Sequence, residues 1–212
     1  MINGEQPFGD KPIYTNDQMP FDELPPLVPQ DNPTGIYERE FSLPSTWKNK
    51  RIVLSIGGFE SVAILSINGN EVGVAKDSRL ASEFDITNFV GNGSNQIQIK
   101  VIKWSDSSFI EDQDQWWHGG ITRSIKLYAT EEVFIERLYP TSGLLADNKT
   151  GTLRVRAHIN SINDASIANY KLRVKVIGVK GASAAAPVIL KDRKSTRLNS
   201  SHVSESRMPS SA

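Results

Sequence analysis

The sequence predicts an all-β protein built as a β-sandwich or jelly roll. Apolar and β-branched residues come in short runs whose length suits strands better than helices. Turn sequences rich in Gly, Asn and Ser, such as Gly91–Ser94, separate these runs. No long segment repeats apolar residues at helical spacing. Short strands with frequent turns are typical of sandwich architectures.

An extended arm is predicted over residues 1–35. This segment holds most of the eleven prolines of the chain, with Pro25, Pro26 and Pro29 close together. Proline fixes φ and lacks the backbone donor that a sheet needs, so we expect the arm to lie extended over the first domain. Its apolar side chains, among them Phe8 and Phe21, argue against a solvated leader.

The first sandwich is predicted over residues 36–130. Its expected strands cover residues 51–56, 61–67, 71–75, 96–101 and 124–128. The segment 96–101 alternates between polar and apolar residues, as a half-buried strand does. Asn68 and Gly69 connect the second and third strands, and these residue types accept the positive φ angles of a type I′ turn.

A second, incomplete sandwich is predicted over residues 131–191, where 152–159 and 171–176 alternate. His158 falls on the polar side of its strand and is expected to be solvated. An unfinished sandwich should leave a strand edge and an apolar face uncovered.

The last segment, residues 192–212, is predicted to be an artefactual, disordered tail. Asp192–His202 can be back-translated into a common sequencing-adapter oligonucleotide, and Ser206–Ala212 into the constant segment after its index. Both matches fall in one reading frame. A natural Ser-rich linker is the alternative. We therefore expect the natural sequence to break off near Lys191.

Composition excludes several classes of function. The 24 basic and 24 acidic residues balance, so no basic patch indicates a nucleic-acid partner. No apolar run is long enough to span a bilayer, which argues against a membrane partner. The absence of cysteine excludes a disulfide framework but leaves the compartment open.

The stretch from Trp104 to Arg123 is the candidate functional segment. It carries four acids, three tryptophans and a Gly-Gly pair. Indole stacks on the C–H faces of a sugar, and carboxylates accept hydrogen bonds from its hydroxyls. The alternative is a loop that anchors the core and has a solvated acidic rim. The three tryptophans, Trp104, Trp116 and Trp117, are interpreted as core and domain-contact anchors.

A second group of polar residues is interpreted as structural. An ion-pair and turn-capping cluster is expected to hold the loop 78–84, because arginine can chelate a carboxylate in a planar fork. Its members are Asp77, Arg79, Glu83 and Asp85.

Four separated motifs, taken in order, resemble the N-terminal region of β-galactosidases of glycoside hydrolase family 2. They are Pro12–Asn16, Asn32–Gly35, Asp77–Asp85 and the stretch from Trp104 to Arg123. The resemblance covers nearly all of residues 7–130 and weakens beyond. The sequence of Trp116–Ile121 differs from that of the best-known bacterial lactase and is also similar to that of β-glucuronidase and β-mannosidase relatives. This similarity leaves the exact sugar open.

The resemblance implies a galactose-binding-like jelly roll, then a truncated immunoglobulin-like sandwich, then a C-terminal (β/α)8 barrel outside this chain. The barrel carries the two catalytic glutamates that hydrolyse terminal β-galactosides with retention. No catalytic residue is therefore expected here, and the chain alone should be inactive. Glu111, Asp112 and Asp114 are not assigned as a catalytic pair, because adjacent loop acids lack the separation that double displacement needs.

Two residues are expected to bind substrate by this resemblance. Asn16 matches the family asparagine that hydrogen-bonds the galactosyl group. Asp114 matches the family aspartate that contacts galactose and helps to bind a monovalent cation. From the residues alone, they would be a turn-capping asparagine and a solvated loop acid. The family implies Na⁺ and Mg²⁺ as cofactors, with no complete site in this chain.

The implied partners are the β-galactoside and the C-terminal barrel of the same chain. Homo-oligomers occur in the family, although no residue here predicts one. The resemblance implies a bacterial protein and leaves open whether it is cytoplasmic or periplasmic. The alternative functions are a stand-alone carbohydrate-binding module, which would need a natural stop after one sandwich, and a structural protein of sandwich domains, which would not explain Asn16 and Asp114.

Overall fold

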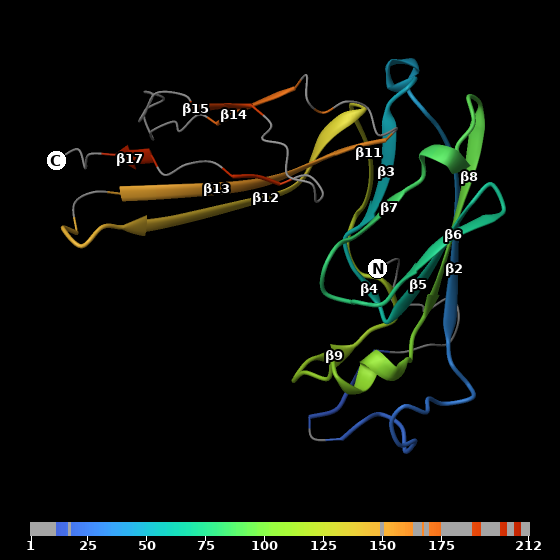
Figure 1. Cartoon of the computed structure of the whole chain (residues 1–212). Helices are drawn as coiled ribbons and strands as arrows, with labels where there is room; N and C mark the ends of the chain where they lie inside the picture. Colours follow the sequence, from blue (N-terminus) through green and yellow to red (C-terminus); the bar gives the residue numbers. More distant parts are fainter. Residues whose placement is uncertain are drawn as a thin grey trace. The chain divides into compact units, whose positions relative to one another are not determined.

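The computed structural model describes residues 12–16, 18–148, 151–162, 167, 170–174, 188–191, 200–202 and 206–208. Strands form most of the regular structure in this part of the chain, which contains no α-helix (Figure 1). The prediction of an all-β chain is therefore confirmed. The chain divides into two compact units, Met1–Ala129 and Thr130–Ala212. The bounds predicted for the individual domains stay predictions.

The first unit is a sandwich of two sheets. One sheet has the strand order β2 (Thr34–Ser42), β8 (Ser94–Ile102), β5 (Val62–Ile67) and β6 (Asn70–Ala75). The other has the order β11 (Ile125–Thr130), β3 (Arg51–Ile56) and β7 (Ser82–Asp85). The sequence predictions include neither β2 nor β7, because the charged run in β2 and the shortness of β7 obscure their alternation.

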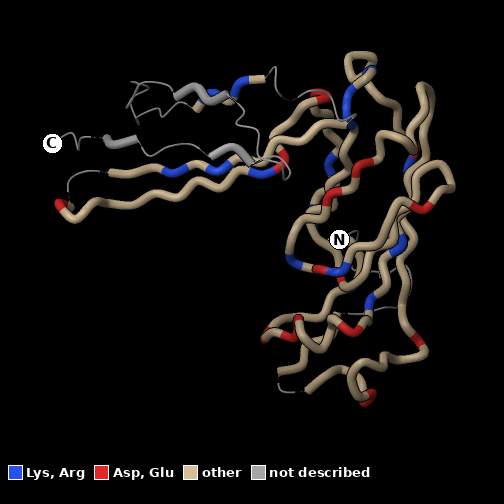
Figure 2. Tube along the Cα trace, viewed as in Figure 1, with Lys and Arg blue, Asp and Glu red and all other residues tan. Residues whose placement is uncertain are grey.

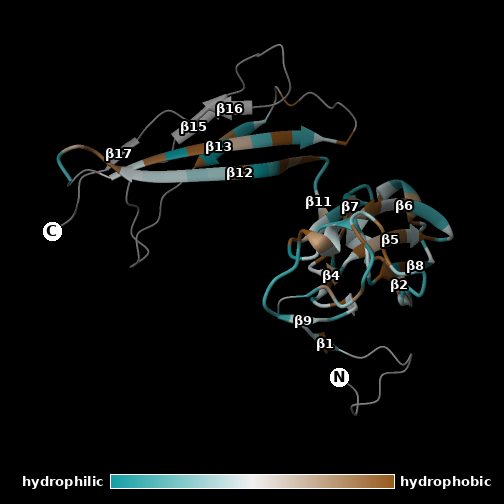
Figure 3. Cartoon of the chain, turned by 90° about the horizontal axis from the view of Figure 1, so that it is seen from below, coloured by the Kyte–Doolittle hydropathy of each residue, from teal (hydrophilic) through white to brown (hydrophobic). Residues whose placement is uncertain are grey.

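Apolar side chains from both sheets fill the space between them. Leu65 of β5 pairs with Ile99 of β8, and their side chains are 0% and 1% exposed. Leu54 and Ile56 of β3 join the same core cluster from the other sheet, and apolar positions along these strands are brown in Figure 3. Burying each such side chain stabilises the fold by about 1.5–3 kcal/mol. The core therefore fixes the strand ends from which the loops emerge.

The hairpin between β5 and β6 forms at the predicted turn. Asn68 and Gly69 have φ angles of 51° and 78°, so both occupy the left-handed region that a type I′ turn requires. The Asn68 side chain also donates to Oδ1 of the buried Asn95 over 2.9 Å. This bond ties the turn to the start of β8.

Short elements complete the first unit. β4 (Phe59–Glu60) pairs with β10 (Gly120–Ile121). β1 (Ile13–Tyr14) pairs with β9 (Trp116–Trp117), and the two lie side by side in Figure 3. Three 3₁₀ helices also occur, η1 (Ser45–Trp47), η2 (Thr87–Phe89) and η3 (Asp106–Phe109).

The second unit contains a long antiparallel pair, β12 (Val133–Leu144) and β13 (Gly151–Ser161). A shorter pair joins β14 (Lys171–Val174) to β15 (Val188–Lys191), and residues 175–176 of the predicted strand lie outside the described residues. His158 is half-buried rather than solvated, because its ring meets that of Tyr139 edge-on at 5.8 Å.

Two pieces of the segment 192–212 pair with β13. They are β16 (Ser200–His202) and β17 (Ser206–Met208). These six residues are strands in the structure, since the open edge of β13 can pair with an extended segment. The rest of the segment lies outside the described residues, and the expectation of a disordered, artefactual tail stays a prediction.

Candidate functional site

The candidate site is the loop that connects β8 to β9. Asn32 holds Trp104 near the start of the loop, since Asn32 Nδ2 donates to the Trp104 carbonyl over 2.8 Å and Asn32 Oδ1 accepts from the Trp104 amide over 2.9 Å. Trp104 then packs edge-on against Trp117 and Phe21, with ring centroids 5.4 and 5.1 Å away. This aromatic cluster anchors the loop and the proline-rich arm together.

One salt bridge and one carboxylate that accepts two hydrogen bonds hold the middle of the loop. Lys76 Nζ lies 2.8 Å from Asp106 Oδ1 in an exposed salt bridge. Glu111 accepts hydrogen bonds from both the amide and the hydroxyl of Ser78, which is 2% exposed. Figure 2 marks the acidic positions of this loop in red. Glu111 is thus an internal anchor, whereas Asp112 is exposed.

The end of the loop is held by the pairing of β1 with β9. Ile13 lies opposite Trp117, and Tyr14 lies opposite Trp116. The indole Nε1 of Trp117 donates to Thr15 Oγ1 over 3.0 Å. A two-residue ribbon therefore joins the arm to a loop that is about 100 residues further along the chain.

Asp114 emerges at this ribbon with an exposed carboxylate. The Tyr14 hydroxyl donates to Asp114 Oδ1 over 2.7 Å. This hydrogen bond, and then the negative charge of Asp114, raise the pKa of Tyr14, because ionising the phenol would remove a donor and bring two negative charges together. Asn16, two residues beyond Tyr14, is also exposed. Both predicted binding residues are therefore accessible and belong to the two segments that the ribbon joins.

The three tryptophans have different environments. Trp104 and Trp117 are 7% and 4% exposed, so their interpretation as core anchors is correct. Trp116 is 55% exposed and is no core residue. Its ring lies 5.6 Å from that of Tyr14, which is 49% exposed. Alternation along β9 explains the difference, because neighbouring strand residues point to opposite faces. Trp116 and Tyr14 form an open aromatic surface beside Asp114.

The expected ion-pair cluster at residues 77–85 has other partners. Arg79 pairs with the buried Glu60 over 3.3 Å, and Asp85 pairs with Arg51 over 2.6 Å. Asp77 does cap the turn, accepting from the amides of residues 79 and 80. Glu83, the fourth predicted member, lies near Tyr128, and after burial its influence helps to raise the pKa of that phenol. The turn-capping and ion-pair roles are therefore found, but the ion-pair partners, Glu60 and Arg51, lie outside the predicted group, because strand pairing brings in residues distant in sequence.

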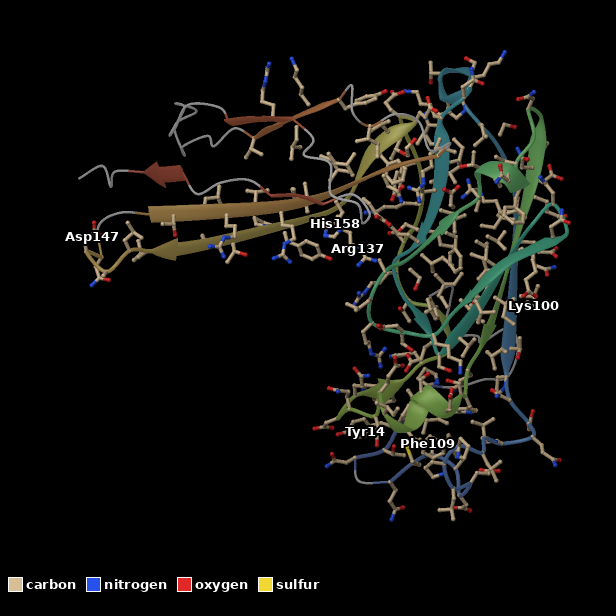
Figure 4. The ribbon with its side chains drawn as sticks, in the orientation of Figure 1. Tyr14, Lys100, Phe109, Arg137, Asp147 and His158 are labelled. Atoms are coloured by element: carbon tan, nitrogen blue, oxygen red, sulfur yellow. The ribbon has the colours of Figure 1, made fainter. Side chains whose placement is uncertain are left out.

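A groove of about 470 Å³ lies beside the loop. Leu80 and Ile110 line it and are 67% and 83% exposed. Gln113 and Gln115, on either side of Asp114, also line it. Asp77, Arg79 and Glu111 complete the lining, so the groove combines two exposed apolar side chains with amides and charged groups, a mixture that a ligand with several hydroxyls can use. Figure 4 shows Tyr14 and Phe109 at the same end of the first unit.

A complete metal site is not formed by the described residues, which contain no group of three or more acidic or histidine ligands. Asp114 offers an exposed carboxylate with one oxygen engaged by Tyr14. A hard cation binds several oxygens, so Asp114 fits one position of such a shell and leaves the others to groups elsewhere.

Tyr14 and Glu111 are the residues of the site that sequence reasoning missed. The alternation of Pro12–Asn16 places Tyr14 and Asn16 on the same side of a strand, which is a signal for Tyr14. No local signal pairs Glu111 with Ser78, because 33 residues separate them.

Comparison with known proteins gives consistent matches. A family model described as glycosyl hydrolases family 2, sugar binding domain, matches residues 4–131. A β-galactosidase of Pseudoalteromonas haloplanktis is 40% identical over 171 residues, which is 81% of this chain and 16% of that protein. A β-galactosidase of Psychromonas ingrahamii is 39% identical over 163 residues, which is 77% of this chain and 16% of that protein.

Solved structures share the fold. A β-glucuronidase of Parabacteroides merdae aligns with a TM-score of 0.71 at 20% identity, covering 84% of this chain and 24% of that one. This chain spans 16% of the length of the two curated relatives. Within the described residues, no helix is long and apolar enough to cross a membrane.

Proposed function

The chain belongs to glycosyl hydrolases family 2, and from this premise we propose that it is the sugar-binding N-terminal part of a β-galactosidase. The complete enzyme hydrolyses terminal β-galactosides with retention. The observation that supports this best is the 39–40% identity with two β-galactosidases over most of the chain. The structural likeness to a β-glucuronidase concerns the fold alone and does not decide which sugar is bound. The alternative to a β-galactosidase within the family is a β-glucuronidase or a β-mannosidase.

In this proposal the first unit supplies one side of the galactosyl subsite. Asp114 accepts a hydrogen bond from a sugar hydroxyl and gives one oxygen ligand to a monovalent cation, Na⁺. Asn16 donates to and accepts from neighbouring hydroxyls through its amide. A bound Na⁺ would orient and polarise a galactosyl hydroxyl. The accessible carboxylate of Asp114 and the exposed Asn16 on the adjoining segment support these roles.

Catalysis belongs to the part of the enzyme outside this chain. Retention needs two carboxyl groups about 5–5.5 Å apart across the sugar, one as nucleophile and one as acid and then base. We propose that a C-terminal (β/α)8 barrel provides both and completes the cation shell. Mg²⁺, which the family resemblance implies, is proposed to bind there as well.

The test is a chimera in which residues 12–131 replace the matching segment of the Pseudoalteromonas β-galactosidase. Asp114→Asn keeps the shape and removes the charge. Because a hydrogen bond to a charged group contributes roughly 1.5–3 kcal/mol, kcat/KM for a chromogenic β-galactoside should fall about ten- to a hundredfold or more. The Na⁺ dependence should also weaken. Asn16→Ala loses a neutral bond, worth roughly 1 kcal/mol or about fivefold.

The matched control is Asp112→Asn, two residues before Asp114 and exposed. It should leave kcat/KM nearly unchanged. A sensitive Asp112 beside a silent Asp114 would overturn the site assignment. Activity of the chimera on a β-glucuronide in preference to the β-galactoside would favour the alternative sugar. A stand-alone binding module would instead bind galactose tightly as the isolated chain and give an inactive chimera.

A further inference from the structure

Tyr14 is the one described residue whose side chain donates to Asp114. Its hydroxyl lies 2.7 Å from Asp114 Oδ1, and its backbone pairs with Trp116 in the β1–β9 ribbon. Its ring also meets the Trp116 ring at 5.6 Å with a tilt of 43°. One side chain therefore contacts both the candidate carboxylate and the exposed indole beside it.

We propose that Tyr14 is a positioning residue that holds Asp114 in the orientation in which it binds the cation and the sugar hydroxyl. This inference rests on the function proposed above and extends it to a residue with no assigned role. Tyr14 contacts neither substrate nor cation in this proposal. It acts through Asp114.

Buried contacts on the face of the ribbon opposite Tyr14 contribute to its stability. On that face, Trp117 is 4% exposed and its indole is hydrogen-bonded to Thr15. Trp104 packs against Trp117 from the sandwich side. These buried contacts hold β1 against β9, whereas Tyr14 is 49% exposed and faces the carboxylate. The Tyr14 ring does pack against the exposed Trp116 indole, a contact that a phenylalanine at this position would keep while losing the donor.

The hydrogen bond restricts Asp114 without occupying all of it. A carboxylate has about four acceptor positions, and the phenol takes one of them on Oδ1. Oδ2 stays available for a cation or a hydroxyl. An exposed aspartate otherwise samples several rotamers, so fixing one before binding reduces the entropy lost on binding. The loop itself is held by Glu111 and Ser78, which leaves the Asp114 side chain as the part that Tyr14 controls.

The variant that tests this is Tyr14→Phe in the active chimera. It keeps the ring and removes the donor. We expect the half-saturating Na⁺ concentration to rise about three- to tenfold and kcat/KM at low Na⁺ to fall by a similar factor, since one hydrogen bond is lost. Saturating Na⁺ should restore most of the activity. Tyr128→Phe is the matched control, because it removes another phenol hydroxyl that lies near a carboxylate, Glu83, and is not part of the loop.

A double-mutant cycle separates positioning from general damage. In the Asp114→Asn background, Tyr14→Phe should have almost no further effect on the Na⁺ dependence. Additive effects would overturn the inference. A sensitive Asp114→Asn together with a silent Tyr14→Phe would also overturn it and leave the proposed function standing. If Asp114→Asn is itself silent, the proposed function fails and the inference fails with it.

A second measurement uses the 212-residue chain and needs no activity. Three-bond NMR couplings report the χ1 rotamer of Asp114. The unchanged chain should show one dominant rotamer, and Tyr14→Phe should shift the couplings toward averaged values. Identical couplings in the two proteins would overturn the positioning role. The melting temperatures of Tyr14→Phe and Tyr128→Phe confirm that each variant is folded.

Discussion

Glu111 anchors the loop that carries Asp114, and Glu111→Ala tests this anchor. The side chain accepts from the Ser78 amide over 3.0 Å and from the Ser78 hydroxyl. Ser78 is 2% exposed, so water does not readily replace either bond. Each hydrogen bond to a charged group contributes roughly 1.5–3 kcal/mol. Because Glu111 is itself only half-buried, we expect a combined loss near the lower end, about 3 kcal/mol.

The assay is urea unfolding followed by tryptophan fluorescence, because Trp104 and Trp117 report on the core beside the loop. With a slope of about 1–3 kcal/mol per molar urea, the midpoint should fall by roughly 1–3 M. Asp112→Ala is the control; it replaces an exposed neighbour and should cost under about 0.5 kcal/mol. The reasoning is refuted if Glu111→Ala costs no more than Asp112→Ala, or if Glu111→Ala and Ser78→Ala prove additive.

Three further predictions concern catalytic activity, the C-terminal segment and stability in acid. The purified 212-residue protein should not hydrolyse a chromogenic β-galactoside, and turnover above a matched blank in a preparation free of host enzyme would contradict this. Deleting residues 192–212 should leave the melting temperature of the first unit unchanged within about a degree, since its core is complete without them; a drop of several degrees would mean that the tail packs. Partial burial alone would raise the pKa of Asp85, but hydrogen bonds from Thr87 and Arg51 outweigh it and lower the pKa below 3.8. The stabilisation by the ionised carboxylate is present above the unfolded pKa of Asp85 and is lost as pH falls through the folded value. Asp85→Asn should therefore reduce the acid sensitivity of urea unfolding below about pH 4, by under about 1 kcal/mol after solvent screening. Equal acid sensitivity in both proteins would argue against a stabilising Asp85–Arg51 pair.

Local signals in the sequence predict those parts of the fold that depend on the conformational preferences of neighbouring residues. The turn at Asn68 and Gly69 is an example, because these two residue types adopt positive φ angles at little cost. Partners distant in sequence are different. Arg79 bonds to Glu60 and Glu111 to Ser78 because the strands bring them together, and no periodicity in the chain encodes those pairs.

The same distinction applies to the site. The resemblance of motifs singles out Asn16 and Asp114, and their exposure on adjoining segments is compatible with the proposed roles. Nothing in the motif distinguishes Trp116 from Trp117, although one is 55% exposed and the other 4%. Only the register of β9 against β1 decides which indole faces outward.

The ribbon of β1 and β9 also bears on the order in which the molecule assembles. It closes a loop of about 100 residues with only two residues on each side, and the entropy of closing a loop grows with its length. The buried cluster of the sandwich core, in contrast, consists of residues between Ile52 and Val101, which lie between the two strands, and only β11 joins the sandwich from beyond β9. We therefore expect the ribbon to close after the sandwich has folded and to open before it unfolds. The edge that carries Asp114 and Trp116 can then open and close again while the sandwich stays folded.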